Sequence, residues 1–237
     1  MPARVLPACL ACLLCHFSLF LSPALRADEQ IFVSGGPALR YFEKHKVSSH
    51  DKFWGNFIHA GVLRYNQIKE EIPKEDTFTW MVFRPSYESR MTEAEFDVIT
   101  EVENRIRPTG AKVVWFSSRD EFIEYINRGQ DRSKVKISRL EYFGHSNKRN
   151  WMFDYSNRLD GAVAAPLCLH INDLPKLNHK SFAPNAYTRS WGCHSGEEYT
   201  NAWQRATGAR MIGAVGKTDY SGGGIPVIST PGGYWTK

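Results

Sequence analysis

Short apolar segments rich in β-branched and aromatic residues alternate with longer segments whose apolar residues recur every three or four positions. The short segments are typical of buried strands, and the longer ones are typical of amphipathic helices. Their alternation favours an α/β fold in which helices cover a mostly parallel sheet. The segments with the strand pattern span residues 31–34, 78–83, 112–116, 139–143, 187–191 and 211–215. We therefore predict a three-layer fold, with a mostly parallel sheet flanked by helices.

Four segments carry the helical pattern, and they lie between the predicted strands. In the first of them, Pro73 marks the end of the periodic stretch. In the second, Thr92 and Glu95 resemble a capping box, and Pro108 stops the helix. The predicted helices span residues 51–70, 93–107, 120–127 and 197–206.

The first 27 residues have the three parts of a secretory signal peptide. Arg4 gives a basic start, residues 5–21 form an apolar run, and small residues lead up to Ala27. The alternative is a membrane anchor that stays on the protein, although this run is at the lower limit for spanning a bilayer. We expect cleavage, one mature domain over residues 28–237, a secreted or periplasmic location and no remaining membrane attachment.

Charge and cysteine content narrow the classes of function. The formal net charge of +5 falls to +3 when Arg4 and Arg26 leave with the signal peptide, and the basic residues are dispersed. Nucleic acid is therefore not an expected partner. Three of the five cysteines also leave, so that Cys168 and Cys193 remain. They could form one disulfide, or one of them could be a reactive thiol.

Chemically active residues follow two of the predicted strands. His145 lies in the segment Gly-His-Ser-Asn after residues 139–143, and Cys193 lies in Gly-Cys-His-Ser-Gly after residues 187–191. In parallel sheets, the loops at the carboxyl ends of the strands build the functional site. We therefore expect the histidine and the cysteine, 48 residues apart, at one edge of the sheet.

This pair suggests nucleophilic catalysis. A neighbouring imidazole such as His145, or the start of the predicted 197–206 helix, would favour the thiolate form of Cys193. Gly192 permits a tight exit from the strand. The backbone N–H of Cys193, together with one from Gly144 or Ser146, could stabilise a tetrahedral oxyanion.

The order His-then-Cys, the spacing near 50 residues and the Gly-Cys-His-Ser-Gly turn resemble the caspase-like cysteine peptidases, the clan of caspases, legumains, gingipains and clostripain. The resemblance covers roughly residues 110–220 and includes the small-residue segment 206–216. It implies a caspase-like fold, in which His145 is the general acid/base and Cys193 is the nucleophile that forms an acyl-enzyme. It also implies a peptide or protein substrate and no cofactor.

Two other groups of polar residues have simpler interpretations. Glu197, Glu198 or Asp219 could line a pocket for a basic side chain, although glutamates in a first helical turn also stabilise the helix. A metal site is not expected, because the candidate ligands do not match the paired spacing of zinc sites. Those candidates are Cys193, His170, His179 and His194.

Two further functions remain open. The segment from Gly144 to Ser146 resembles the start of the nucleophile elbow of α/β-hydrolases, which would make Ser146 the nucleophile of a serine esterase. Lys148 stands where that motif has glycine, and the residues after it do not have a helical pattern. A non-catalytic extracytoplasmic binding module on the same fold is the other alternative.

Overall fold

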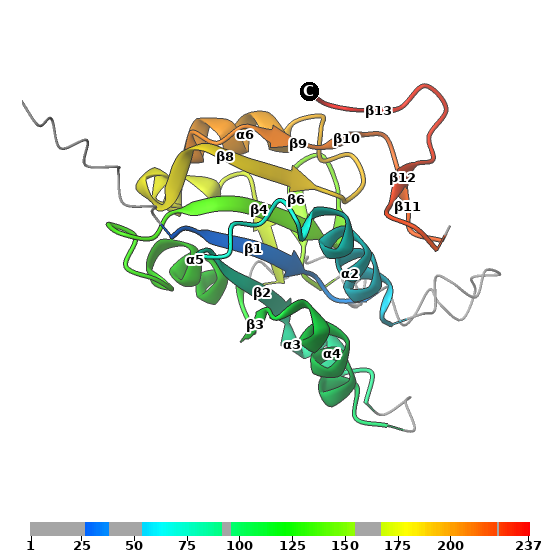
Figure 1. Ribbon diagram of the computed structural model, residues 1–237. Coiled ribbons are helices and arrows are strands. Elements are labelled where there is room, and N and C mark those ends of the chain that lie inside the picture. Colours follow the sequence, from blue (N-terminus) through cyan, green and yellow to red (C-terminus); the bar gives the residue numbers. More distant parts are fainter. Residues whose placement is uncertain (1–26, 38–53, 92–95, 155–166, 222) are drawn as a thin grey trace, which may run out of the picture.

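The computed structural model describes residues 27–37, 54–91, 96–154, 167–221 and 223–237. Its centre is a six-stranded sheet in which every strand is parallel to its neighbours, in the order β3-β2-β1-β4-β8-β9 (Figure 1). The strands are β1 (Glu29–Ser34), β2 (Thr77–Phe83), β3 (Lys112–Phe116), β4 (Ile137–Phe143), β8 (Phe182–Ser190) and β9 (Met211–Ile212). The predicted parallel sheet is confirmed. Apart from Ala27, the predicted signal peptide lies outside the described residues.

Helices cover both faces of this sheet. They are α2 (Asn56–Ile68), α3 (Arg84–Glu88), α4 (Val98–Ile106), α5 (Arg119–Arg128) and α6 (Tyr199–Thr207), with short 3-10 turns η2 (Arg107–Thr109), η4 (Leu174–Lys176) and η5 (His179–Ser181). Along β1, Ile31 and Val33 pack into the core that includes α5 and α6, whereas Phe32 packs into the core that includes α2 and α4. Strands buried on both faces are typical of parallel sheets covered by helices. The three-layer α/β architecture is therefore confirmed.

Three helices begin later than the sequence predicts, and one of them is α2, which begins at Asn56 rather than at residue 51. The Asp97 side chain accepts hydrogen bonds from the backbone N–H groups of Ile99 (2.9 Å) and Thr100 (3.3 Å), so that α4 begins at Val98 rather than at residue 93. The predicted capping residues Thr92 and Glu95 lie outside the described residues. Helix α6 begins at Tyr199 rather than at residue 197, because the preceding residues form a turn.

Two strands differ by more than two residues from their predicted bounds. Strand β8 begins at Phe182, five residues earlier than expected, because Pro184 lies where β8 bulges against β4 and so breaks the strand pattern. The predicted strand over residues 211–215 is interrupted at Gly213. Beyond this glycine, β10 (Ala214–Val215) leaves the sheet and pairs with β13 (Tyr234–Trp235).

Smaller antiparallel units surround the carboxyl ends of the strands. β5 (His145–Ser146), β6 (Asn150–Met152) and β7 (Cys168–His170) form a three-stranded sheet that continues directly from β4. β11 (Thr218–Asp219) and β12 (Val227–Ile228) form a pair of their own. These units lie at the sheet edge where the sequence predicts the functional residues.

Two glutamates are fully buried within the sheet, and each is paired with arginine. Glu29 on β1 contacts Arg132 at 2.6 Å and accepts hydrogen bonds from Thr79 (2.6 Å) and Tyr125 (2.8 Å). We call this group the Glu29 cluster. Because a buried charge is costly unless it is paired and hydrogen-bonded, these partners offset the cost of burying the Glu29 carboxylate.

The second buried glutamate lies on β4. Glu141 contacts Arg64 of α2 at 3.0 Å and Arg139 at 2.8 Å, and it accepts a hydrogen bond of 2.9 Å from the Trp191 indole. We call this group the Glu141 cluster. It joins α2 to the residue that follows β8.

The strand order reverses between β1 and β4. From β1 the chain adds β2 and then β3 on one side, and it then returns to place β4 on the other side of β1. In open α/β sheets, a crevice forms at the carboxyl ends of the strands at such a reversal. The segment from Gly144 to Ser146 follows β4 and therefore begins at this point.

Candidate active site

His145 and Cys193 follow neighbouring strands of the sheet. Tyr142 of β4 is in register with Ser190 of β8, and the Trp191 backbone N–H donates to the Tyr142 carbonyl at 2.9 Å. Each functional residue comes within three positions of the end of its strand. The sequence therefore correctly predicted that the two turns meet at one edge of the sheet.

The two turns are in direct contact. The Ser146 hydroxyl donates a hydrogen bond of 2.6 Å to the Cys193 carbonyl oxygen. A side chain on Gly192 would lie 2.2 Å from the Ser146 hydroxyl and 2.7 Å from the Gly144 carbonyl, so that only glycine fits there. Gly192 thus permits the close approach of the His145 turn and the Cys193 turn, and Ser146 holds them together.

The Cys193 thiol is half-buried and is not part of a disulfide. Its sulfur accepts a hydrogen bond from the Thr218 backbone N–H at 3.3 Å and lies 3.4 Å from the Thr218 hydroxyl. A donor to the sulfur favours the charged form of a thiol, whereas the Cys193 thiol can also donate to the Thr218 carbonyl at 3.8 Å. The expected stabilisation by a helix N-terminus was wrong, because α6 begins six residues after the cysteine. Strand β11 supplies the donor instead.

Cys168 is the other described cysteine, and it is also a free thiol. It is buried in β7, and burial raises the pKa of its thiol. A raised thiol pKa lowers the fraction of thiolate, so this side chain is suited to packing rather than to chemistry. Cys168 and Cys193 therefore remain separate, and Cys193 is the more accessible of the two.

His145 lies beside one aromatic side chain, which in turn contacts a second. Its ring meets Phe57 of α2 edge to face, with ring centroids 5.0 Å apart, and Phe57 makes a second contact of 5.0 Å with Tyr220. The Tyr220 hydroxyl donates to the Trp191 carbonyl at 3.2 Å. This aromatic row therefore extends from the His145 turn to the backbone just before Cys193.

Tyr220 interacts with both turns. Burial raises the pKa of Tyr220 well above its usual value; the neighbouring Cys193 adds to the rise, and a hydrogen bond with the Gly144 backbone opposes it. The Tyr220 phenol therefore lies near the backbone of the predicted oxyanion residue Gly144. A side chain on Gly144 would also strike the Tyr142 hydroxyl, at 2.4 Å.

The acidic residue Glu197 contacts a histidine of the Cys193 turn. Glu197 Oε1 lies 2.5 Å from Nδ1 of His194, whose backbone adopts a left-handed conformation with φ of 57°. Asp219 accepts a hydrogen bond from the Ser221 backbone N–H at 2.7 Å. The roles of Glu197 and Asp219 toward a basic substrate side chain remain predictions.

The backbone of the Cys193 turn is fixed by the segment that follows β9. The N–H groups of His194 and Gly196 donate to the carbonyls of Gly216 (2.7 Å) and Ala214 (2.8 Å). A side chain on Gly196 would lie 2.7 Å from the Gly213 carbonyl. Gly196 therefore permits this close packing of two backbones.

The alternative based on a serine nucleophile elbow is wrong in its geometry. That motif needs a sharp turn from a strand into a helix, whereas Ser146 leads into the antiparallel strands β5 and β6. The Asn147 side chain accepts hydrogen bonds from the backbone N–H groups of Arg149 (2.8 Å) and Asn150 (2.9 Å), which shapes a hairpin turn. The Ser146 hydroxyl meanwhile donates to Cys193.

Sequence reasoning missed Thr218, Tyr220 and Phe57, although all three contact the predicted residues. Phe57 had the pattern of a helical core residue, and the other two follow the last strand of the sheet. The positions of Thr218 and Tyr220 depend on the chain leaving the central sheet after Gly213, and no local sequence motif predicts that change of direction.

The described residues contain no cluster of three or more histidine, cysteine or acidic side chains arranged to hold a metal ion. No helix in the described ranges is long and apolar enough to cross a membrane. Comparisons with protein-family models, curated proteins and solved structures give no match for this chain.

Proposed function

We propose that this protein is an exported cysteine hydrolase, secreted or periplasmic, that cleaves an amide bond in a peptide or protein. The observation that carries the proposal is the 2.6 Å hydrogen bond from Ser146 to Cys193, which holds the His145 turn against the Cys193 turn. The unbridged thiol of Cys193 and its Thr218 donor support a nucleophilic role. The resemblance to caspase-like peptidases points to the same two residues.

In the first half of the proposed reaction, the Cys193 thiolate attacks the substrate carbonyl carbon, and the sulfur–carbon bond forms. His145 carries the proton taken from the thiol and gives it to the departing nitrogen as the carbon–nitrogen bond breaks. The amine product leaves, and the other half of the substrate remains as a thioester on Cys193. No external oxidant or reductant is needed.

In the second half, water attacks the thioester carbonyl while His145 accepts a proton from that water. The sulfur–carbon bond breaks, which regenerates the cysteine and releases a carboxylic acid. The backbone N–H groups of Cys193 and Gly144 are the candidate oxyanion donors.

The decisive experiment is labelling with an acyloxymethyl-ketone probe, followed by mass spectrometry of the modified residue. We expect wild-type protein and Cys168→Ala to be labelled at Cys193, and Cys193→Ala to remain unlabelled. His145→Ala should be labelled at least about 100 times more slowly than wild type, given the usual contribution of a general base. Unchanged labelling of Cys193→Ala or of His145→Ala would overturn the dyad.

A second experiment tests the contact between the turns. Ser146→Ala removes the hydrogen bond to the Cys193 carbonyl and should slow labelling, at a cost of about 1 kcal/mol in stability. Ser181→Ala is the matched control, because the Ser181 hydroxyl is buried and has no hydrogen-bond partner among the described residues. Equal labelling rates for these two variants would contradict the role of the Ser146 contact.

A further inference from the structure

Strand β3 lies at one end of the sheet, and no described strand pairs with its outer edge. The strand at the other end, β9, has two residues, whereas β3 has five, Lys-Val-Val-Trp-Phe. An edge strand presents unpaired backbone N–H and C=O groups that can pair with another chain. β3 contains no proline that would prevent such pairing.

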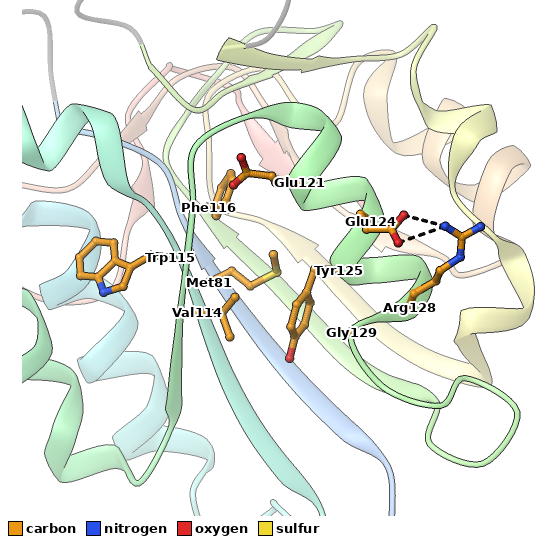
Figure 2. Close-up of a pocket in the computed structure, with 9 residues that line it drawn as sticks. All are labelled: Met81, Val114, Trp115, Phe116, Glu121, Glu124, Tyr125, Arg128 and Gly129. Carbon is orange, nitrogen blue, oxygen red and sulfur yellow. Dashed lines mark hydrogen bonds and ion pairs between the residues drawn. The ribbon is translucent and has the colours of Figure 1, made fainter.

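A groove runs beside this edge, between β3 and α5. Figure 2 shows Val114 and Met81 between the strand and the helix, with Tyr125 on the helix side. The cavity has a volume of about 310 Å³ and an apolar floor. Glu121 and Glu124 of α5 are exposed at its rim. Arg128, also at the rim, pairs with Glu124 at 3.0 Å (Figure 2), so the groove combines an apolar base with the negative charge of Glu121.

We propose that this edge is a homodimer interface, in which β3 pairs antiparallel with β3 of a second copy about a two-fold axis at Val114. In this register Val114 lies opposite Val114 of the partner subunit, and Lys112 lies opposite Phe116 of the partner subunit. The two central sheets then become one continuous sheet. The inference is independent of the cysteine chemistry.

Charge complementarity favours a second copy as the occupant. Lys112, Val114 and Phe116 share one face of the strand, because side chains alternate between faces. Val114 and Phe116 line the groove, so that Lys112 lies on the α5 side as well. A strand paired in this register brings its Lys112 beside Phe116 of the other copy.

An acidic side chain stands at that position. The Glu121 carboxylate accepts a hydrogen bond of 2.8 Å from the Ser117 backbone N–H, directly after Phe116. Each Lys112 therefore meets Glu121 of the other copy, and the two-fold axis generates this pair twice. Lys112 and Glu121 are both exposed in the single chain.

The opposite face of the strand is complementary in shape. Val113 lies opposite Trp115 of the partner subunit, and β-branched residues pair favourably with aromatic residues across antiparallel strands. Val113 and Trp115 are only partly buried in the single chain. Dimer formation would cover both of them, and the paired valines would close the groove on the α5 side.

Sedimentation velocity over a concentration series tests the interface. We expect wild type to show a reversible dimer. Lys112→Glu and Glu121→Lys should each weaken dimerisation about tenfold, because each opposes like charges at two symmetric positions. The double variant Lys112→Glu with Glu121→Lys restores opposite charges and should recover most of the affinity. Lys74→Glu, at an exposed position outside this edge, makes the same charge change and is the control.

Thermal unfolding shows whether each variant is folded, which matters most for Glu121→Lys because it loses the bond to Ser117. If Glu121→Lys unfolds, the dimer affinity of Lys112→Glu is compared with that of Lys74→Glu. Both lysines are exposed, so neither change should unfold the single chain. A monomer at every concentration would overturn the proposal. A dimer that is equally tight in Lys112→Glu and Lys74→Glu would overturn it as well.

Discussion

The Glu29 and Glu141 clusters use the same chemistry at two ends of the central sheet. Both carboxylates are fully buried, lie on adjacent strands and contact arginine. Glu29 is the first residue of β1, and Arg132 comes from the connection between α5 and β4. Glu141 lies two residues before the end of β4 and reaches Trp191, which is followed by Gly192 and Cys193.

The difference lies in what each cluster is attached to. The Glu29 cluster joins β1, β2 and α5 at the end of the sheet away from the candidate active site. The Glu141 cluster joins α2 to the residue from which the Cys193 turn begins. The same buried ion pair can therefore support the fold alone or support both the fold and the site. Four predictions test this distinction.

The largest effect is expected for Glu29→Gln. The substitution leaves the Arg132 guanidinium buried without its charged partner, which should cost about 3 to 5 kcal/mol of unfolding free energy. Urea denaturation measures this loss. Under conditions where the variant is folded, probe labelling of Cys193 should keep the wild-type rate. Slower labelling would show that the two ends of the sheet are coupled.

Glu141→Gln should have a smaller effect on stability and a larger one on the site. Arg64 and Arg139 are about one-seventh exposed and keep some solvation, so we expect a loss of about 2 to 3 kcal/mol. Probe labelling should also slow several-fold, because Trp191 loses its charged acceptor. If the labelling rate stays unchanged, Glu141 supports the fold alone and the comparison fails.

Trp191→Phe isolates the link between the Glu141 cluster and the Cys193 turn. It keeps an aromatic ring against Phe143 and Trp235 but removes the N–H that donates to Glu141. We expect a loss of about 1 to 2 kcal/mol in urea denaturation, together with slower labelling.

The matched control for that variant is Trp203→Phe. Its indole N–H is buried and has no hydrogen-bond partner among the described residues, so the same truncation removes ring volume without breaking such a bond. Labelling should be faster in Trp203→Phe than in Trp191→Phe. Equal rates in the two variants would refute the link through the indole N–H.

The smallest effect concerns pH and the Glu29 cluster. Burial raises the pKa of Tyr125 to about 12, and the charge of Glu29 adds to the rise. An unfolded tyrosine ionises near pH 10, so the native state holds one more proton between about pH 10 and 12. Stability from this phenol is complete below pH 10 and falls as the pH rises through that window.

Because the Tyr125 phenol is partly exposed to solvent, we expect this fall to be at most about 1 kcal/mol per pH unit. The unfolding free energy, taken from denaturation curves at each pH, should fall less steeply with pH in Tyr125→Phe than in wild type. Tyr65→Phe, at a partly exposed tyrosine stacked on Phe78, is the control and should keep the wild-type slope. A slope in Tyr125→Phe as steep as that of wild type would exclude this contribution.

The sheet was predictable because its strands are apolar on both faces and are separated by amphipathic segments. The start of β8 was not, because Pro184 interrupts its pattern while the strand bulges around it. The buried glutamates also escaped prediction, since isolated carboxylates in a sequence are normally exposed. Their partners Arg132 and Arg64 are 103 and 77 residues away.

The candidate site was predictable only as far as parallel strands bring their carboxyl ends together. That rule placed His145 and Cys193 at one edge, but it could not reveal the contact between Ser146 and Cys193. The expected helix donor failed because the Cys193 turn is longer than its glycines suggest. Thr218 replaces it, and that contact depends on packing between segments 25 residues apart.

The interruption of the last strand at Gly213 affects when the surroundings of Cys193 can form during synthesis of the chain. Gly213 exchanges hydrogen bonds with Thr236, and Trp235 packs against Trp191. The neighbourhood of Cys193 thus draws on residues that are synthesised after the cysteine itself. Until residues 214–218 have been synthesised, the nascent chain carries Cys193 without the Thr218 donor and without the backbone carbonyls that fix its turn.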